Sequence, residues 1–102
     1  MKRFLQEDKL IIQAQFDLVA SQLQEYVMNP VDFFDHPAEY NEVILDISMV
    51  NNIDSMGITF IVGLFKAAAN KGKKFHVKGM HQDIYHVFQL IKLDGAFDIE
   101  LK

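Results

Sequence analysis

Residues 43–57, VILDISMVNNIDSMG, give the clearest indication of the fold of this chain. The first five of them are apolar and mostly β-branched apart from one aspartate, which predicts a strand in the interior of a sheet. Asn51-Asn52 is typical of a turn, and Asp54-Ser55 is typical of the start of a helix. The stretch therefore predicts a buried strand that leads through a short loop into a helix.

The helix after this loop carries the strongest pattern in the chain. We expect it to run from Asp54 or Ser55 to about Asn70, with Gly72 as its C′ residue after Lys71. The polar side is narrow, because two apolar stripes lie side by side. The stripe expected to face the sheet comprises Ile58, Ile61, Val62 and Phe65, and the second comprises Phe60, Leu64 and Ala67. Either another helix of the domain or a partner protein should cover the second stripe.

Working outward, the periodicity of apolar residues alternates between that of strands and that of helices. Upstream we expect strands at 2–5 and 10–15, and then a helix capped by Asp17 and ended by Asn29-Pro30. Downstream we expect a strand at 74–78, a helix with a stripe from Ile84 to Ile91, and a strand at 97–101. Between residues 31 and 41 we expect a loop that contains Phe33 and Phe34. Such a loop could widen a binding surface or fold onto the core, and exposed aromatic pairs favour folding onto the core.

The elements follow in the order β-β-α-β-α-β-α-β. This alternation predicts an α/β fold, with a mixed sheet of four to five strands that has parallel members, and about three helices. A chain of 102 residues provides one core, so we expect a single domain over residues 1–102. The predicted core comprises Leu10, Ile12, Val43, Leu45, Ile47, Ile58, Ile61, Val62, Phe65, Val77, Ile84, Val87, Phe88 and Ile91.

Composition excludes several classes of function. The chain has no cysteine, which rules out a disulfide framework, a thiolate metal site and a cysteine nucleophile. Its formal net charge of −4 does not favour binding to nucleic acid or to an anionic membrane. No apolar run approaches the ~20 residues of a membrane span, and we expect a cytoplasmic protein. The four histidines have no helical i, i+4 spacing, so we expect no metal site.

The candidate site lies where the predicted helix begins. Ser55 would occupy its first turn, where the helix dipole favours negative charge. A phosphoryl group there would add about −1.5 to −2 charge and would repel a partner with acidic or apolar groups on that surface. Asp54 would oppose the phosphate, so we expect its carboxylate to point away or into solvent. On spacing alone, plain helix capping with no regulatory role is the commoner explanation of the same residues.

Three features together resemble a STAS domain of the bacterial anti-sigma factor antagonist type. They are Val43-Ile44-Leu45-Asp46-Ile47, then Ile53-Asp54-Ser55-Met56-Gly57-Ile58, and then a helix that ends in Asn70-Lys71-Gly72-Lys73. The resemblance continues weakly upstream at Ala14-Gln15-Phe16-Asp17 and downstream at the Asp94-Gly95 turn. Met56 departs from the second hydroxyl residue of the family motif, and Ala14 departs from a family glycine.

The resemblance implies a protein-interaction module that is switched by phosphorylation at Ser55. Asp54, Met56 and Gly57 would shape the loop. The partner-binding residues would be Met56, Thr59, Phe60, Gly63 and Lys66. The unphosphorylated form would bind a serine kinase/anti-sigma factor with a histidine-kinase-like ATPase fold, and a metal-dependent serine phosphatase would reset the phosphorylated form. The chain itself would be no enzyme and would hold no cofactor.

A second hypothesis is a STAS-like domain that is never phosphorylated. Such a domain would scaffold a complex or bind a small ligand, either a lipid or a nucleotide. Phe33, Phe34 and the missing second hydroxyl at Met56 favour it. An enzyme has less support, because Ser55 lacks the first glycine of a G-x-S-x-G elbow and no phosphate-binding glycine loop occurs.

Overall fold

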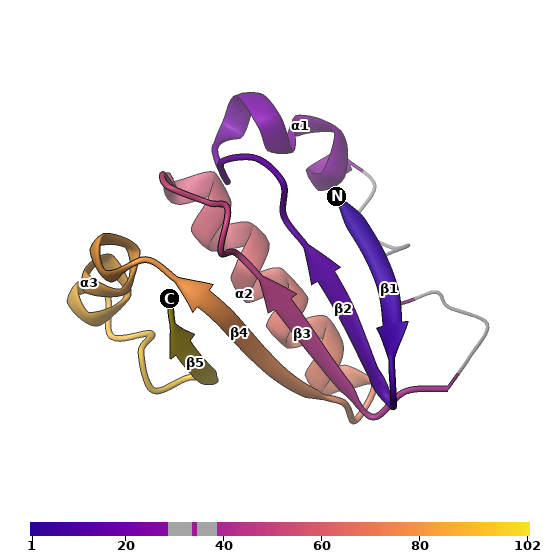
Figure 1. The fold of residues 1–102 in the computed structure, drawn as a ribbon. Helices are drawn as coiled ribbons and strands as arrows, with labels where there is room; N and C mark the ends of the chain where they lie inside the picture. The colour runs from indigo at the N-terminus through magenta and orange to yellow at the C-terminus, as the bar shows by residue number, and fades with distance from the viewer. Residues whose placement is uncertain (29–33, 35–38) are drawn as a thin grey trace.

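The computed structural model describes residues 1–28, 34 and 39–102, and the side chains of 27 and 28 are left out of the description. Five strands and three helices occur in the predicted order (Figure 1). The strands are β1 (Lys2–Gln6), β2 (Lys9–Gln13), β3 (Glu42–Asp46), β4 (Lys74–Met80) and β5 (Asp98–Leu101). The helices are α1 (Ala20–Met28), α2 (Ser55–Asn70) and α3 (Gln82–Leu90). The α/β class and the order of elements are therefore confirmed.

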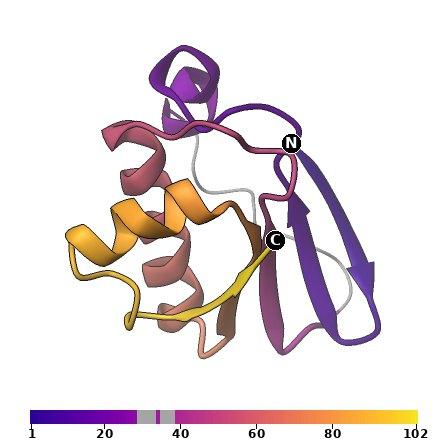
Figure 2. The ribbon, with the colours of Figure 1, turned by 60° about the vertical axis from the view of Figure 1, so that its left-hand side comes forward.

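The five strands form one mixed sheet in the order β1-β2-β3-β4-β5. β1 pairs with β2 in the antiparallel direction, and every later pair is parallel. α2 and α3 cover the same face of this sheet, and α1 lies at the end where the parallel strands finish (Figures 1 and 2). The starts of α1 and α2 are thereby brought to one end of the molecule.

Apolar rows of the sheet face these helices. Leu10, Val43 and Phe75 are in register across β2, β3 and β4, and the next row but one is Ile12, Leu45 and Val77. All six are buried and belong to the hydrophobic core. Ile11, on the opposite face of β2, is also buried, so the burial of β2 does not strictly alternate. Of the remaining predicted core, Ile47, Ile61, Ile84 and Phe88 are also buried.

Five predicted core residues are less buried than expected. Four are half-buried, namely Ile58, Val62, Phe65 and Val87. Ile91 is 44% exposed, so its assignment to the core is wrong. α3 ends at Leu90 and Ile91 is its C-cap, so the i+7 position of the stripe falls where the helix has already stopped.

The buried face of α2 differs from the predicted one. It comprises Gly57, Phe60, Ile61, Leu64 and Ala68. This line runs between the two predicted stripes, so the expectation that the first stripe alone faces the sheet is wrong. Periodicity shows how much of the helix surface is apolar. The packing of α1 and β4 against α2 determines which of these apolar residues are most deeply buried. The second stripe is thus covered within the domain at Phe60 and Leu64.

The end of α2 follows the predicted pattern. Lys71 is the C-cap, and Gly72 has a φ of 70°. The Gly72 N–H donates to the Ala69 carbonyl at 3.0 Å, and the Lys73 N–H donates to the Ala68 carbonyl at 2.9 Å. These two bonds form a Schellman motif, which requires a residue that tolerates a left-handed backbone.

Replacing Gly72 with alanine should destabilise the domain by about 1–2 kcal/mol, because a side chain at positive φ is strained. Nothing lies within 4 Å of an added Cβ, so the effect is purely conformational. Urea unfolding measures it. Gly95→Ala is the control, because Gly95 also has open space and no positive φ. Equal stability of the two variants would contradict the prediction.

Two aromatic residues of the predicted 31–41 loop are buried. Phe34 and Tyr40 are each 6% exposed, and the Tyr40 hydroxyl donates to the Phe34 carbonyl at 2.5 Å. The Lys73 ammonium donates to the Tyr40 carbonyl at 2.6 Å and lies 4.8 Å from the centre of the Tyr40 ring. Folding of the loop onto the core is confirmed for these residues. Phe33 and the predicted helix end at Asn29-Pro30 lie outside the described residues.

Candidate functional site

The candidate site is formed where the loop after β3 enters α2. Ser55 is the first residue of α2 and is exposed, and Asp54 is the N-cap with φ −118° and ψ −173°. The Thr59 hydroxyl, one turn further along, donates to the Ser55 carbonyl at 2.9 Å. The cap is thus provided by Asp54, and the side chain of Ser55 stands on the surface at the positive end of the helix dipole.

The Asp54 carboxylate connects two helices. Oδ1 accepts from the Gly57 N–H in α2 at 3.0 Å, and Oδ2 accepts from the Ala20 N–H at the start of α1 at 2.9 Å. The bond from Ala20, followed by that from Gly57, holds the pKa of the Asp54 carboxyl below its usual value. Both oxygens of Asp54 are therefore engaged by backbone donors, although the bond from Ala20 is exposed. The expectation that the carboxylate points away from a phosphate on Ser55 or into solvent stays a prediction.

Asp17 makes the complementary connection. Its Oδ2 accepts from the Asn52 side-chain amide at 3.1 Å, and its Oδ1 accepts from the backbone N–H groups of Asn51 at 2.9 Å and Asn52 at 3.2 Å. The Asn52 side chain, and then the Asn51 N–H, lower the pKa of the Asp17 carboxyl. The prediction that Asp17 caps the first helix is wrong. That helix begins at Ala20, and Asp17 instead holds the loop that leads to α2.

Main-chain contacts complete this connection. The Leu18 N–H donates to the Asn52 carbonyl, and the Asp54 N–H donates to the Leu18 carbonyl, both at 3.2 Å. A Cβ on Gly57 would lie 2.0 Å from the Leu18 carbonyl oxygen. Gly57 therefore permits the segment before α1 to approach the first turn of α2. We call the contacts of Asp17, Leu18, Ala20, Asp54 and Gly57 the aspartate clasp.

The other predicted site residues divide into a surface group and a buried one. Thr59, Gly63 and Lys66 are exposed and lie with Ser55 along one side of α2. Met56 is half-buried and packs against the core. Phe60 is only 7% exposed and packs in the core, so little of its side chain is available to a partner.

Asp46 lies at the end of β3, below the loop. It is 8% exposed, and its Oδ1 accepts from the Ser48 N–H at 2.9 Å. Burial raises the pKa of this carboxyl, but the bonds from Ser48, the charge of Lys78 and the Gln13 amide outweigh burial and leave the pKa below its usual value. Asp46 thus fixes the first turn of the loop that carries the site.

Acid should destabilise this end of the domain. The pKa values of Asp17, Asp46 and Asp54 are all lower in the folded state than the reference value of 3.8. Their contribution to folding stability is fully present above that value and is lost as the pH falls through the lower folded-state values. Urea unfolding at a series of pH values should show stability falling below about pH 4. In Asp46→Asn, stability should decrease less steeply as the pH falls. An unchanged dependence of stability on pH would contradict the contribution assigned to Asp46.

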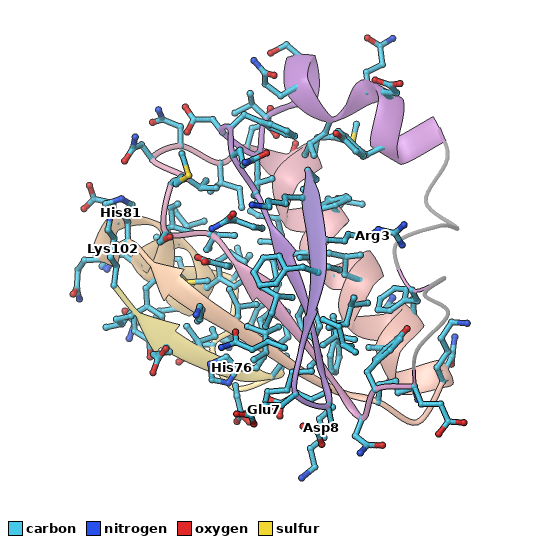
Figure 3. The ribbon with its side chains drawn as sticks, turned by 45° about the vertical axis from the view of Figure 1, so that its right-hand side comes forward. Arg3, Glu7, Asp8, His76, His81 and Lys102 are labelled. Atoms are coloured by element: carbon cyan, nitrogen blue, oxygen red, sulfur yellow. The ribbon has the colours of Figure 1, made fainter. Side chains whose placement is uncertain are left out.

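The described histidines belong to different parts of the fold. His76 lies within β4, and His81 lies between β4 and α3 (Figure 3). Among the described residues, no group of three histidine, aspartate or glutamate side chains is placed to hold a metal ion. His36 lies outside the described residues. No helix in the described part of the chain has the length and apolar character needed to cross a membrane.

Solved structures share this architecture. A proposed anti-sigma factor antagonist from Thermotoga maritima is 23% identical, with 99% of this chain and 86% of that chain covered and a TM-score of 0.84. A chain of the stressosome, a signal integration and transduction hub, is 14% identical, with 99% and 88% covered and a TM-score of 0.70. A sulfate transporter family protein from Wolinella succinogenes is 12% identical, with 95% and 80% covered and a TM-score of 0.77.

At these identities the structural likeness shows the fold alone. Sequence comparison goes further, because the model of one family matches residues 3–102, nearly the whole chain. The predicted resemblance, based on the segment around Asp46 and the Asp54-Ser55-Met56-Gly57 loop, is thereby confirmed. The chain belongs to the STAS domain family.

Proposed function

We propose that this STAS domain is a phosphorylation-switched interaction module of the anti-sigma factor antagonist type. The unphosphorylated form binds a serine kinase/anti-sigma factor with a histidine-kinase-like ATPase fold, and phosphorylation of Ser55 releases that partner. A metal-dependent serine phosphatase restores the binding form. The observation that carries the proposal is the exposed Ser55 at the first position of α2, beside an N-cap that does not need its hydroxyl. The chain acts as a cytoplasmic binding protein and not as an enzyme.

The chemistry requires an accessible hydroxyl and a donor supplied by the partner. The Ser55 oxygen forms a bond to the γ-phosphorus of ATP as the bond to the bridging oxygen of ADP breaks, and the hydroxyl proton passes to a base of the kinase. The product carries about −1.5 to −2 charge at the end of α2. A partner surface fitted to a neutral hydroxyl would then face an unpaired dianion, which is a repulsive contact.

The docking surface consists of Ser55, Thr59, Gly63 and Lys66 on α2, with half-buried Met56 at its edge. Gly63 is informative because nothing lies within 4 Å of an added Cβ. No contact within the described domain explains a glycine in the middle of this helix, where it costs about 0.5–1 kcal/mol relative to alanine. Close approach of a partner backbone at this position would explain it.

Gly63→Ala should therefore separate stability from binding. We expect the free domain to become more stable by about 0.5–1 kcal/mol. We expect affinity for the partner to fall about tenfold, because a methyl group then enters a close contact. Urea unfolding and calorimetric titration measure the two effects. Unchanged affinity would place Gly63 outside the contact surface.

Intact-mass measurement tests the proposal directly. The purified domain is incubated with ATP, Mg²⁺ and a serine kinase of histidine-kinase-like ATPase fold from the same genome. One phosphoryl group should be added to the native chain and to the control Ser21→Ala, and none to Ser55→Ala. Ser21 is also exposed, near the start of α1, so it controls for loss of any surface hydroxyl. A phosphate that persists in Ser55→Ala would defeat the proposal.

The second candidate, an unphosphorylated scaffold or a domain for a lipid or nucleotide, has lost part of its support. Phe34 was expected to favour a ligand, but it is 6% exposed and belongs to the core. Native mass spectrometry of the freshly purified domain distinguishes the two candidates, because a retained small molecule supports the second.

A further inference from the structure

We infer that a phosphoryl group on Ser55 breaks the hydrogen bond between Asp54 and Ala20 and so loosens the start of α1 from α2. The inference rests on the proposed function, because it takes Ser55 as the modified residue. It adds a responding element, α1, and a residue that transmits the change, Asp54.

Both oxygens of the Asp54 carboxylate are already engaged by backbone donors. Its two oxygens accept from donors in different elements, Gly57 in α2 at 3.0 Å and Ala20 in α1 at 2.9 Å. The carboxylate is held between the helix starts and immediately precedes Ser55 in the chain. Turning away from Ser55 therefore means giving up at least one of these two bonds.

A phosphate on Ser55 opposes the carboxylate in two ways. Its charge of about −1.5 to −2 repels the neighbouring negative charge of Asp54. Its oxygens also compete for the same donors, because the N–H groups at the start of α2 attract anions and already face Asp54. Both effects act on the contacts of Asp54 and not on the buried face of α2.

The two hydrogen bonds accepted by Asp54 should differ in how easily they break. The Gly57 bond spans three residues within one helix cap, so α2 itself keeps donor and acceptor together. The Ala20 bond joins residues 34 positions apart and is exposed. We therefore expect the Ala20 bond to be lost first.

The change should remain local. Leu18 stays joined to Asn52 and Asp54 through main-chain hydrogen bonds, and Asp17 still holds the loop. Only the first turn of α1 is released, where Ala20, Ser21 and Gln22 are exposed beside the start of α2. Phosphorylation would thus alter a surface larger than the modified side chain.

Amide hydrogen exchange of the full chain tests this coupling. Phosphoserine is installed at position 55 during synthesis, so that no kinase is needed, and exchange at the Ala20 amide is followed by NMR. We expect exchange at Ala20 to speed up about tenfold or more, because a hydrogen bond to a charged acceptor is lost. The Leu45 amide of the core sheet should not change.

Two variants test whether the phosphate on Ser55 acts on Ala20 through Asp54. Asp54→Asn keeps an oxygen for Gly57 but cannot serve both donors, so Ala20 should exchange quickly and phosphoserine at 55 should add nothing. Asn70→phosphoserine places the same charge at the far end of α2 and should leave Ala20 unchanged. Equal protection of Ala20 with and without phosphate on Ser55, or a phosphate effect that persists in Asp54→Asn, would overturn the inference. Because the phosphate is installed synthetically, either of these results would leave the proposed function untouched, and the intact-mass experiment with the kinase tests that function independently.

Discussion

Gly57→Ala is expected to destabilise the domain by about 3 kcal/mol, the largest effect on stability that we predict. The added Cβ would lie 2.0 Å from the Leu18 carbonyl oxygen and 2.6 Å from Cγ1 of Ile53. The first of these neighbours is backbone, which cannot rotate away as the end of a side chain does. Relief requires the segment before α1 to separate from α2, which breaks the aspartate clasp.

Gly63→Ala is the matched control, because it makes the same substitution six residues further along α2 in open space. Urea unfolding of both variants should show changes of opposite sign. A loss of stability shared equally by the two would mean that helix composition, and not the contact with Leu18, sets the effect at Gly57. Amide exchange in Gly57→Ala should also rise at Ala20.

Charge at Ser55 is expected to produce the largest effect on binding. Phosphoserine at this position should weaken partner binding about 100-fold or more, since a buried like-charge or unpaired contact costs several kcal/mol. Ser55→Asp should weaken it only about tenfold, because one carboxylate carries less charge than a phosphate and has fewer acceptor oxygens. Ser55→Ala should bind nearly as well as the native chain.

Calorimetric titration with the purified partner measures these affinities. Gln89→Asp provides the control, because Gln89 is exposed near the end of α3 and its substitution changes net charge by the same amount. Equal weakening by Ser55→Asp and Gln89→Asp would show that overall charge, and not the position at the start of α2, governs binding.

The aspartate clasp joins the starts of α1 and α2 through the side chains of two aspartates. Asp17 precedes α1 but holds the loop before α2, while Asp54 precedes α2 but also holds the start of α1. Because each aspartate accepts hydrogen bonds from the segment near the other, the two helix starts are held together beside Ser55. A phosphoryl group on Ser55 would therefore affect the starts of both α1 and α2, and not the serine side chain alone.

The elements, their order and the location of the candidate site could all be predicted from the sequence. Strand and helix periodicity are local properties, so the interior strand around Leu45 and the helix from Ser55 to Asn70 could be predicted. The end of that helix was equally predictable, because Gly72 and the two residues beside it form a local motif. Family resemblance added the proposed role of Ser55, which periodicity cannot supply.

Which side chains and backbone groups contact one another could not be predicted from the sequence. Asp17 and Asp54 both look like ordinary helix caps in the sequence. Nothing local shows that the donors to Asp17, and one of the two donors to Asp54, lie 34 or 35 residues away. The burial of Phe60 and the need for Gly57 likewise depend on how closely α1 and the segment before it approach α2. The physical reason is that hydrogen-bond and steric partners are set by distances between chain segments. Those distances exist only after the sheet has brought the starts of both helices to one end.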